Sequence, residues 1–203
     1  MRSGSSDSRT IVARAPVRVS FGGGGTDLEA YYARFGGFVV SAAIARYCYA
    51  IARPAANARV QITSADYGVW QVSEPGEIPA VEEPLALPKA VVAHFAGAGL
   101  PRHGIDLFLA SEVPPGTGLG SSSAVTVALI QAVAGYLGEP LAPDVIAELA
   151  CRIEIEQLGM PIGKQDQYAA AFGGLNALTF SADRTEVTPL PVAPSVLAEL
   201  ERH

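Results

Sequence analysis

Short runs of alternating apolar and polar residues fill the first third of the chain and predict β-strands. Between positions 17 and 21, Val17, Val19 and Phe21 alternate with Arg18 and Ser20, the pattern of a half-buried strand. Similar patterns predict further strands at 11–14, 38–44, 47–52, 58–63 and 69–72. Turn residues separate these segments, so we expect them to form a β-meander.

Helical patterns dominate the middle of the chain. Four consecutive glycines at 22–25 precede Thr26 and Asp27, either of which is expected to cap a helix. Further helices are expected at about 87–98, 123–137, 143–158, 164–172 and 195–202, with strands at 104–110, 175–180 and 186–190. Strands followed by helices and then by strands predict an α+β fold and not a regular doubly wound sheet.

Composition narrows the classes of protein that fit. Of 203 residues, 49% are hydrophobic and 17% are charged, which indicates a domain with a real core. A net charge of −6 and a pI near 5.0 argue against nucleic acid as a partner. Scattered basic residues argue against a membrane surface. The two cysteines are expected to be reduced core residues.

The apolar runs are too short to predict a membrane span, which needs about 18 residues. The first ten residues are polar and lack the apolar run of a signal peptide. We therefore expect a cytoplasmic protein with a disordered tail at 1–10.

The sharpest motif is the Gly-rich stretch at 114–124. Gly116, Gly118 and Gly120 allow the backbone to curl so that several N–H groups point at one spot, just before a helix begins. Helix amides and serine hydroxyls there suit phosphate and Mg²⁺. The stretch is not a Walker A loop. A serine-capped turn of an ordinary helix explains it equally well when it is taken alone.

Two carboxylates follow on a helical hairpin. Glu154 ends one predicted helix and Asp166 starts the next, twelve residues later, with a Gly/Pro turn between them. One carboxylate could bind metal and the other a reacting hydroxyl, while Lys164 would keep Asp166 ionised. The alternative is that both are solvated charges on helix surfaces.

Three ordered motifs, at 15–28, 114–124 and 159–167, resemble those of the galactokinase, homoserine kinase, mevalonate kinase and phosphomevalonate kinase superfamily (GHMP kinases). The resemblance implies a mixed β-sheet packed by helices, a fold similar to that of a ribosomal protein domain. The Gly-rich 21–28 segment and the 164–174 segment are most similar to the heptose kinase branch. That branch phosphorylates the anomeric hydroxyl of D-glycero-D-manno-heptose 7-phosphate to give the 1,7-bisphosphate.

The resemblance also implies roles for single residues. Asp166 matches the catalytic aspartate, Arg18 matches an arginine that stabilises the transferring phosphoryl, and Lys164 could share that task. Ser122 and Glu154 match the Mg²⁺ ligands. The ATP phosphates are expected at Pro115, Gly116, Thr117, Gly118, Leu119, Gly120, Ser121 and Ser122. The sugar is expected at Gly24, Gly25, Thr26 and Asp27.

The chain departs from the superfamily at its carboxyl end. Nothing after position 180 matches the third superfamily motif, so we expect an N-terminal ATP-binding domain at 11–180 and the start of a C-terminal domain, largely missing, at 181–203. The expected function is MgATP-dependent phosphorylation of a sugar hydroxyl. A kinase for another sugar and a non-catalytic nucleotide-binding fragment stay open as alternatives. The sequence predicts no oligomeric state.

Overall fold

A mixed β-sheet is the central element of the fold. The computed structural model describes residues 9–98, 100 and 104–202, so most of the expected tail at 1–10 lies outside the described residues. The strand order is β4-β3-β5-β2-β6-β7, with β1 paired to β2. β3 and β5 are parallel and the other pairs are antiparallel. The strands are β1 (Ile11–Gly22), β2 (Gly37–Arg53), β3 (Val60–Ser64), β4 (Val69–Val72), β5 (Ile105–Ser111), β6 (Leu175–Phe180) and β7 (Thr185–Pro189).

One long strand, β2, organises the sheet. It pairs with β1 along one edge, and with β6 and then β5 along the other. The two strands expected at 38–44 and 47–52 are therefore one strand, because Ala45 and Arg46 between them supply no turn residue. The predicted β-meander is also wrong, because β2 pairs with β5 and β6, which are distant from it in the sequence. β1 also continues through Pro16, with a register shift after it where the proline lacks an N–H.

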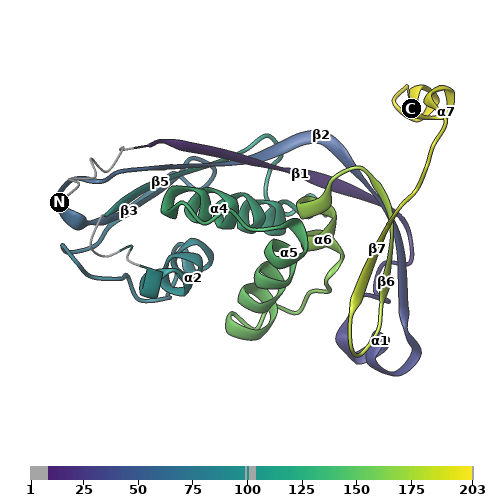
Figure 1. Ribbon diagram of the computed structural model, residues 1–203, viewed down its shortest axis with the longest axis horizontal. Helices are drawn as coiled ribbons and strands as arrows, with labels where there is room; N and C mark the ends of the chain where they lie inside the picture. The colour runs from purple at the N-terminus through teal and green to yellow at the C-terminus, as the bar shows by residue number, and fades with distance from the viewer. Residues whose placement is uncertain (1–8, 99, 101–103, 203) are drawn as a thin grey trace, which may run out of the picture.

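Helices cover one face of this sheet (Figure 1). α4 packs against β1 and β2, and its small apolar side chains, such as Ala124, Val127 and Ala128, are fully buried. The helices are α1 (Glu29–Phe35), α2 (Ala86–His94), α4 (Ser121–Leu137), α5 (Pro143–Cys151), α6 (Gln165–Phe172) and α7 (Pro194–Leu200). Short helical turns are η1 (Ala56–Ala58), η2 (Ala96–Ala98) and the π-helical η3 (Arg152–Gln157). The expected α+β fold, with a mixed sheet packed by helices, is confirmed.

Two local differences from the sequence prediction affect the site. The first helix begins after Leu28 without any side-chain cap, so the expected cap by Thr26 or Asp27 is wrong. The helix expected at 143–158 changes at Arg152 into the π-helical turn η3, which carries Glu154. Such turns often mark functional positions.

The last helix, α7, stands apart from the rest of the fold in Figure 1, and all of its residues are exposed. No helix in the described parts of the chain has the length and apolar character needed to cross a bilayer.

Candidate active site between the Gly-rich loop and helix α6

The Gly-rich loop joins β5 to α4 and is held by β1. Gly116, Gly118 and Gly120 have φ values of 78°, 73° and 74°, the left-handed region that glycine adopts most easily. The Arg18 backbone N–H donates to Leu119 O at 3.0 Å, and Arg18 Nη1 donates to Gly118 O at 2.6 Å. Strand β1 therefore fixes the shape of the loop from the side.

The start of α4 is open to an anion. Gly120 is its N-cap residue, and no side chain caps the helix. The first amides of a helix have no partner within it, and they carry the positive end of the helix dipole. Because the loop at 114–118 is exposed, these amides are suited to bind phosphate oxygens, as the sequence predicted.

Asp166 lies directly against this loop. Both Arg18 Nε and Arg18 Nη2 bind its Oδ1, at 2.7 and 2.5 Å. A Cβ built on Gly120 would lie only 3.1 Å from Asp166 Oδ2, so a glycine is needed there for the carboxylate to approach. Oδ2 receives no hydrogen bond from any residue that the structure describes. The carboxylate thus has one oxygen held and one oxygen available.

Burial and charge oppose each other at Asp166. Burial raises the pKa of its carboxyl, the Arg18 charge and hydrogen bonds lower it, and the charge of Asp27 raises it; the net shift is upward. Lys164 does not take the place that the sequence suggested beside Asp166. Its Nζ lies 3.6 Å from Glu148 Oε2 and 5.8 Å from the centre of the Tyr32 ring. The cation that acts on Asp166 is Arg18.

Asp27 is a buried anchor and not an open side chain. It is 2% exposed. Its Oδ1 accepts from the Gly25 N–H at 2.9 Å and from Gln165 Nε2 at 3.3 Å, and its Oδ2 accepts from the Gln165 N–H at 3.1 Å. A Cβ on Gly163 would lie 2.0 Å from Oδ2, so only glycine fits there. Asp27 therefore ties the 22–27 segment to the start of α6, serving as a cap for a distant helix.

The other residues expected to bind sugar divide into two groups. Gly24 and Gly25 are exposed, with the Gln165 side chain beside Gly24. The Thr26 hydroxyl instead serves the protein itself: it donates to Gly23 O at 2.7 Å and accepts from the Phe38 N–H at 3.0 Å. Thr26 thus stabilises the turn that presents the two glycines.

Glu154 lies in the interior behind the same loop and is fully buried. Its Oε2 accepts from Ser123 Oγ at 2.8 Å and from Gln167 Nε2 at 2.5 Å, and its Oε1 accepts from Thr126 Oγ1 at 2.6 Å. Burial raises the pKa of this carboxyl, and the three donors only partly oppose that effect. No cation among the described residues pairs with it.

The predicted metal ligands are not joined by a hydrogen bond. Ser122 is exposed at the first turn of α4, and within the described residues it makes no hydrogen bond to Glu154. Thr126 links them, because its hydroxyl contacts both Ser122 O at 3.2 Å and the Glu154 carboxylate. No group of three His, Cys, Asp or Glu residues in the described chain could hold a metal ion. An uncompensated carboxylate beside serine hydroxyls still fits Mg²⁺, which commonly takes one carboxylate together with phosphate oxygens.

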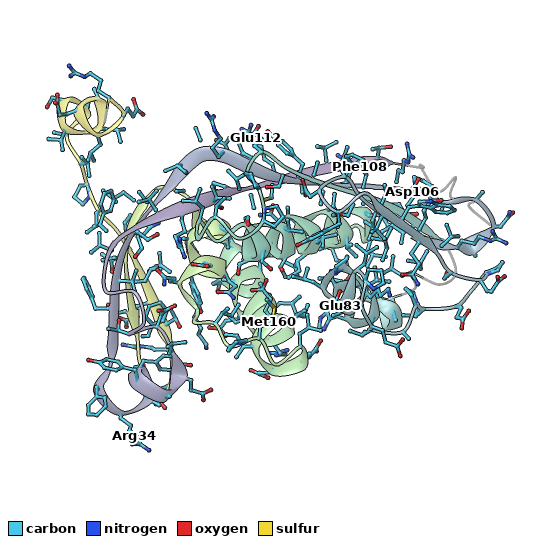
Figure 2. The ribbon with its side chains drawn as sticks, turned by 180° about the vertical axis from the view of Figure 1, so that it is seen from behind. Arg34, Glu83, Asp106, Phe108, Glu112 and Met160 are labelled. Atoms are coloured by element: carbon cyan, nitrogen blue, oxygen red, sulfur yellow. The ribbon has the colours of Figure 1, made fainter. Side chains whose placement is uncertain are left out.

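A cavity of about 490 Å³ opens beside Ser122, and no sequence motif predicted it. Leu85, Leu109, Val125 and Met160 are among the residues that line it. Figure 2 shows Glu83 and Met160, two lining residues, on the helix side of the sheet, away from Phe108 on the open face. The lining residues come from segments far apart in sequence, and none forms a motif. The only local signal was the apolar character of the loop after Leu158.

Comparison with known proteins agrees with this geometry. Residues 86–174 match the family described as GHMP kinases N terminal domain. The chain is 35% identical over 198 residues to a D-glycero-alpha-D-manno-heptose 7-phosphate kinase of Campylobacter jejuni, covering 95% of this chain and 58% of that protein. It is 30% identical to a galactokinase of Roseiflexus, with 92% and 46% covered.

Solved structures show the same relationship. A D-glycero-D-manno-heptose 1-phosphate kinase from Bacteroides thetaiotaomicron superposes with a TM-score of 0.89 at 31% identity, covering 95% of this chain and 63% of that one. A sugar kinase from Campylobacter jejuni, described as putative, gives 0.83 at 34% identity, with 97% and 61% covered. The chain therefore spans less than two thirds of the length of these relatives.

Proposed function

The chain carries a GHMP kinase N-terminal domain, and we propose that it binds MgATP for phosphoryl transfer to a sugar hydroxyl. The acceptor in this proposal is the anomeric hydroxyl of D-glycero-D-manno-heptose 7-phosphate. The observation that carries it is the position of Asp166, whose unpaired Oδ2 faces the Gly-rich loop while Oδ1 is held by Arg18. We assign the ATP-binding domain to 11–180 and the start of a second domain to 181–203.

Two neighbouring features support ATP as the phosphoryl donor. The open amides at the start of α4 and the loop at 115–122 suit the phosphates. The cavity beside Ser122 is mostly apolar and of a size that suits a nucleoside. ATP would therefore lie with its base in the cavity and its terminal phosphate near Asp166.

Ser122 and Glu154 would hold Mg²⁺ together with phosphate oxygens. When bound, Mg²⁺ neutralises charge on the phosphates and so lowers the barrier to attack. Burial and, to a smaller extent, the charge of Asp166 raise the pKa of Glu154, so a cation bound there would favour the ionised carboxylate. Some of the hydrogen bonds to Glu154 are expected to break on binding, because Ser123, Thr126 and Gln167 now occupy the carboxylate.

Asp166 orients the acceptor through Oδ2. The sugar hydroxyl donates a hydrogen bond to this oxygen, its oxygen attacks the γ-phosphorus, and the bond to the bridging oxygen of ADP breaks. The hydroxyl proton passes to Asp166 and then to solvent. Arg18 lowers the pKa of Asp166 against the larger effect of burial, and its hydrogen bond to Gly118 O ties the loop to the same guanidinium. Positioning and electrostatics supply most of the catalysis in this class of reaction.

Two observations favour a sugar phosphate as the acceptor. Two relatives that match 95% of this chain have names that refer to heptose phosphates. Gly24 and Gly25 are exposed beside α6, so they leave room for a bulky or phosphorylated sugar. A cytoplasmic location, where ATP and sugar phosphates occur, is part of the same proposal.

ADP release tests the function directly. The chain, with MgATP, is supplied separately with heptose 7-phosphate, galactose and mevalonate, and the product is identified by mass and by phosphorus NMR. We expect release with heptose 7-phosphate at a kcat/KM at least tenfold above the other two. Equal or higher rates with galactose or mevalonate would overturn the substrate assignment.

A non-catalytic nucleotide-binding role is the second candidate. The uncapped start of α4 and the apolar cavity beside Ser122 account for nucleotide binding without any contact to an acceptor. Calorimetric binding of ATP without ADP release on any acceptor would establish this role and exclude turnover by this chain.

A further inference from the structure

Gln165 is the first residue of α6 and directly precedes Asp166. Its backbone N–H donates to Asp27 Oδ2 at 3.1 Å, and its side-chain Nε2 donates to Asp27 Oδ1 at 3.3 Å. A carboxylate accepts hydrogen bonds and repels a carbonyl oxygen, so the Gln165 amide must present its NH₂ group to Asp27. The orientation of the amide is therefore determined, and its Oε1 points away from Asp27.

This Oε1 is buried and receives no hydrogen bond in the described structure. A buried acceptor without a donor is unfavourable and uncommon in folded proteins. The described residues contain two other buried side-chain atoms of this kind, Ser20 Oγ and Gln167 Oε1. All three lie on β1 or α6, the two elements that supply Arg18 and Asp166. Unsatisfied polar groups thus gather where a polar ligand is expected.

Asp27 cannot offer what Gln165 offers. Its two oxygens take three hydrogen bonds from Gly25 and Gln165, and it is 2% exposed. Gly24 runs beside the Gln165 amide, where an added Cβ would lie 3.7 Å from Nε2. A side chain longer than Cβ at position 24 would lie against the amide, whereas the glycine adds no atoms between the amide and the exposed turn.

We propose that Gln165 Oε1 accepts a hydrogen bond from a sugar hydroxyl other than the one that attacks, and that Asp27 acts as the positioning residue that aims it. This inference rests on the proposed sugar kinase function and names a contact for that site. Gln165 and Asp166, successive residues in the first turn of α6, then each accept a hydrogen bond from a different hydroxyl of the same sugar. Asp27 contributes without touching the substrate.

The test removes first the hydrogen-bond acceptor on Gln165 and then the sugar hydroxyl that would donate to it. Gln165→Met should raise the KM for heptose 7-phosphate about five- to tenfold, the equivalent of one neutral hydrogen bond, while the KM for ATP stays unchanged. Monodeoxy analogues of the acceptor are then compared with the parent sugar. For the wild-type chain, the KM for one deoxy analogue should exceed the KM for the parent sugar by the same factor. For Gln165→Met, the KM values for that analogue and for the parent sugar should be equal.

Two further variants make the result decisive. Gln61→Met changes a half-buried glutamine on β3 and should leave both KM values unchanged. If Gln165→Met does not fold by circular dichroism, Gln165→Asn withdraws the acceptor but keeps an amide, and the same pattern is expected.

The proposal is overturned if the folded variants keep the wild-type KM for the sugar, or if they lose activity equally with every deoxy analogue. A wild-type chain that phosphorylates none of the sugars overturns the proposed function itself. That failure is visible before any variant is made, so it is distinguishable from a failure of the Gln165 assignment.

Discussion

The carboxylates of Asp166 and Glu154 lie on consecutive helical segments, yet the fold gives them opposite surroundings. Asp166 meets a guanidinium on one oxygen and leaves the other free, at the edge of an exposed loop. Glu154 is fully buried and meets three neutral donors on both oxygens. Burial raises the pKa of both groups, but a charge opposes the shift only at Asp166.

This difference separates two tasks that similar residues could share. A charged partner favours the ionised form of a buried carboxylate, and at Asp166 it leaves one oxygen for a substrate. A buried carboxylate without a cation has a reason to bind one, and its neutral donors hold it in place until then. Asp166 is therefore suited to the acceptor hydroxyl and Glu154 to the metal, in agreement with the proposed function.

The largest effect is expected from Asp166→Asn. The amide retains the shape of the side chain but cannot take the proton of the acceptor, so kcat should fall by about a hundredfold or more. ADP release under saturating MgATP and sugar measures it. Glu156→Gln, on an exposed position of η3, is the control and should leave kcat unchanged. An unaltered rate in Asp166→Asn would exclude this residue from the mechanism.

Arg18→Met would make the two carboxylates alike by removing the charge from Asp166. Activity should fall by about ten- to a hundredfold, as expected for loss of a positioned electrostatic group. Arg18 lowers the pKa of Asp166, so its removal raises that pKa, and the acid limb of the kcat/KM profile moves to higher pH.

The matched control is Arg53→Met, which removes a surface arginine that binds Asp106 at 2.8 Å. Exposed pairs of this kind contribute little, so activity and pH profile should stay as in the wild type. An acid limb that does not move in Arg18→Met would show that Asp166 is not the group that titrates.

Ser122→Ala tests the metal side of the comparison. Loss of one ligand should raise the Mg²⁺ concentration for half-maximal activity by about tenfold, whereas kcat at saturating Mg²⁺ changes less. Ser195→Ala, on the exposed helix α7, is the control and should not change the Mg²⁺ dependence. Identical titration curves for Ser122→Ala and the wild type would exclude Ser122 as a ligand.

The smallest effect concerns stability and Glu154. Its folded pKa is above the unfolded value, so the folded state holds an extra proton in the interval between the two pKa values. The free energy of unfolding therefore falls as pH rises through that interval. In Glu154→Gln this group no longer titrates, and the fall should be shallower.

Urea unfolding at several pH values measures this slope, and Glu156→Gln again serves as the exposed control. Equal slopes for Glu154→Gln and Glu156→Gln would show that burial does not raise the pKa of Glu154.

Much of the fold and part of the site could be predicted from the sequence. The Gly-rich motif placed a loop before a helix, and the hairpin placed Asp166 at the start of another helix. Both are local features, because glycine and proline residues mark where one element ends and the next begins. The fold class followed from the order of strands and helices. The prediction that Asp166 lies next to the loop is confirmed by its approach to Gly120.

The sequence did not predict which side chains from distant segments contact each other. The partner of Asp166 is Arg18 and not the nearby Lys164, because α6 directs Lys164 toward Glu148 while β1 delivers Arg18 to the loop. Asp27 was expected to cap its own helix, and it caps α6 instead; its expected contact with sugar stays a prediction. The cavity beside Ser122 likewise consists of separate segments without a motif.

The sequence by itself determined the local elements and the types of chemical group available: a flexible loop before a helix, carboxylates, an arginine and hydroxyls. Only the tertiary structure decided which carboxylate received a charged partner, which was buried without one, and which polar atoms were left unsatisfied. The physical reason is that helices and turns arise from neighbours in the chain. The charge, burial and hydrogen bonding of a side chain depend instead on elements that the sheet and its helices bring together from far apart.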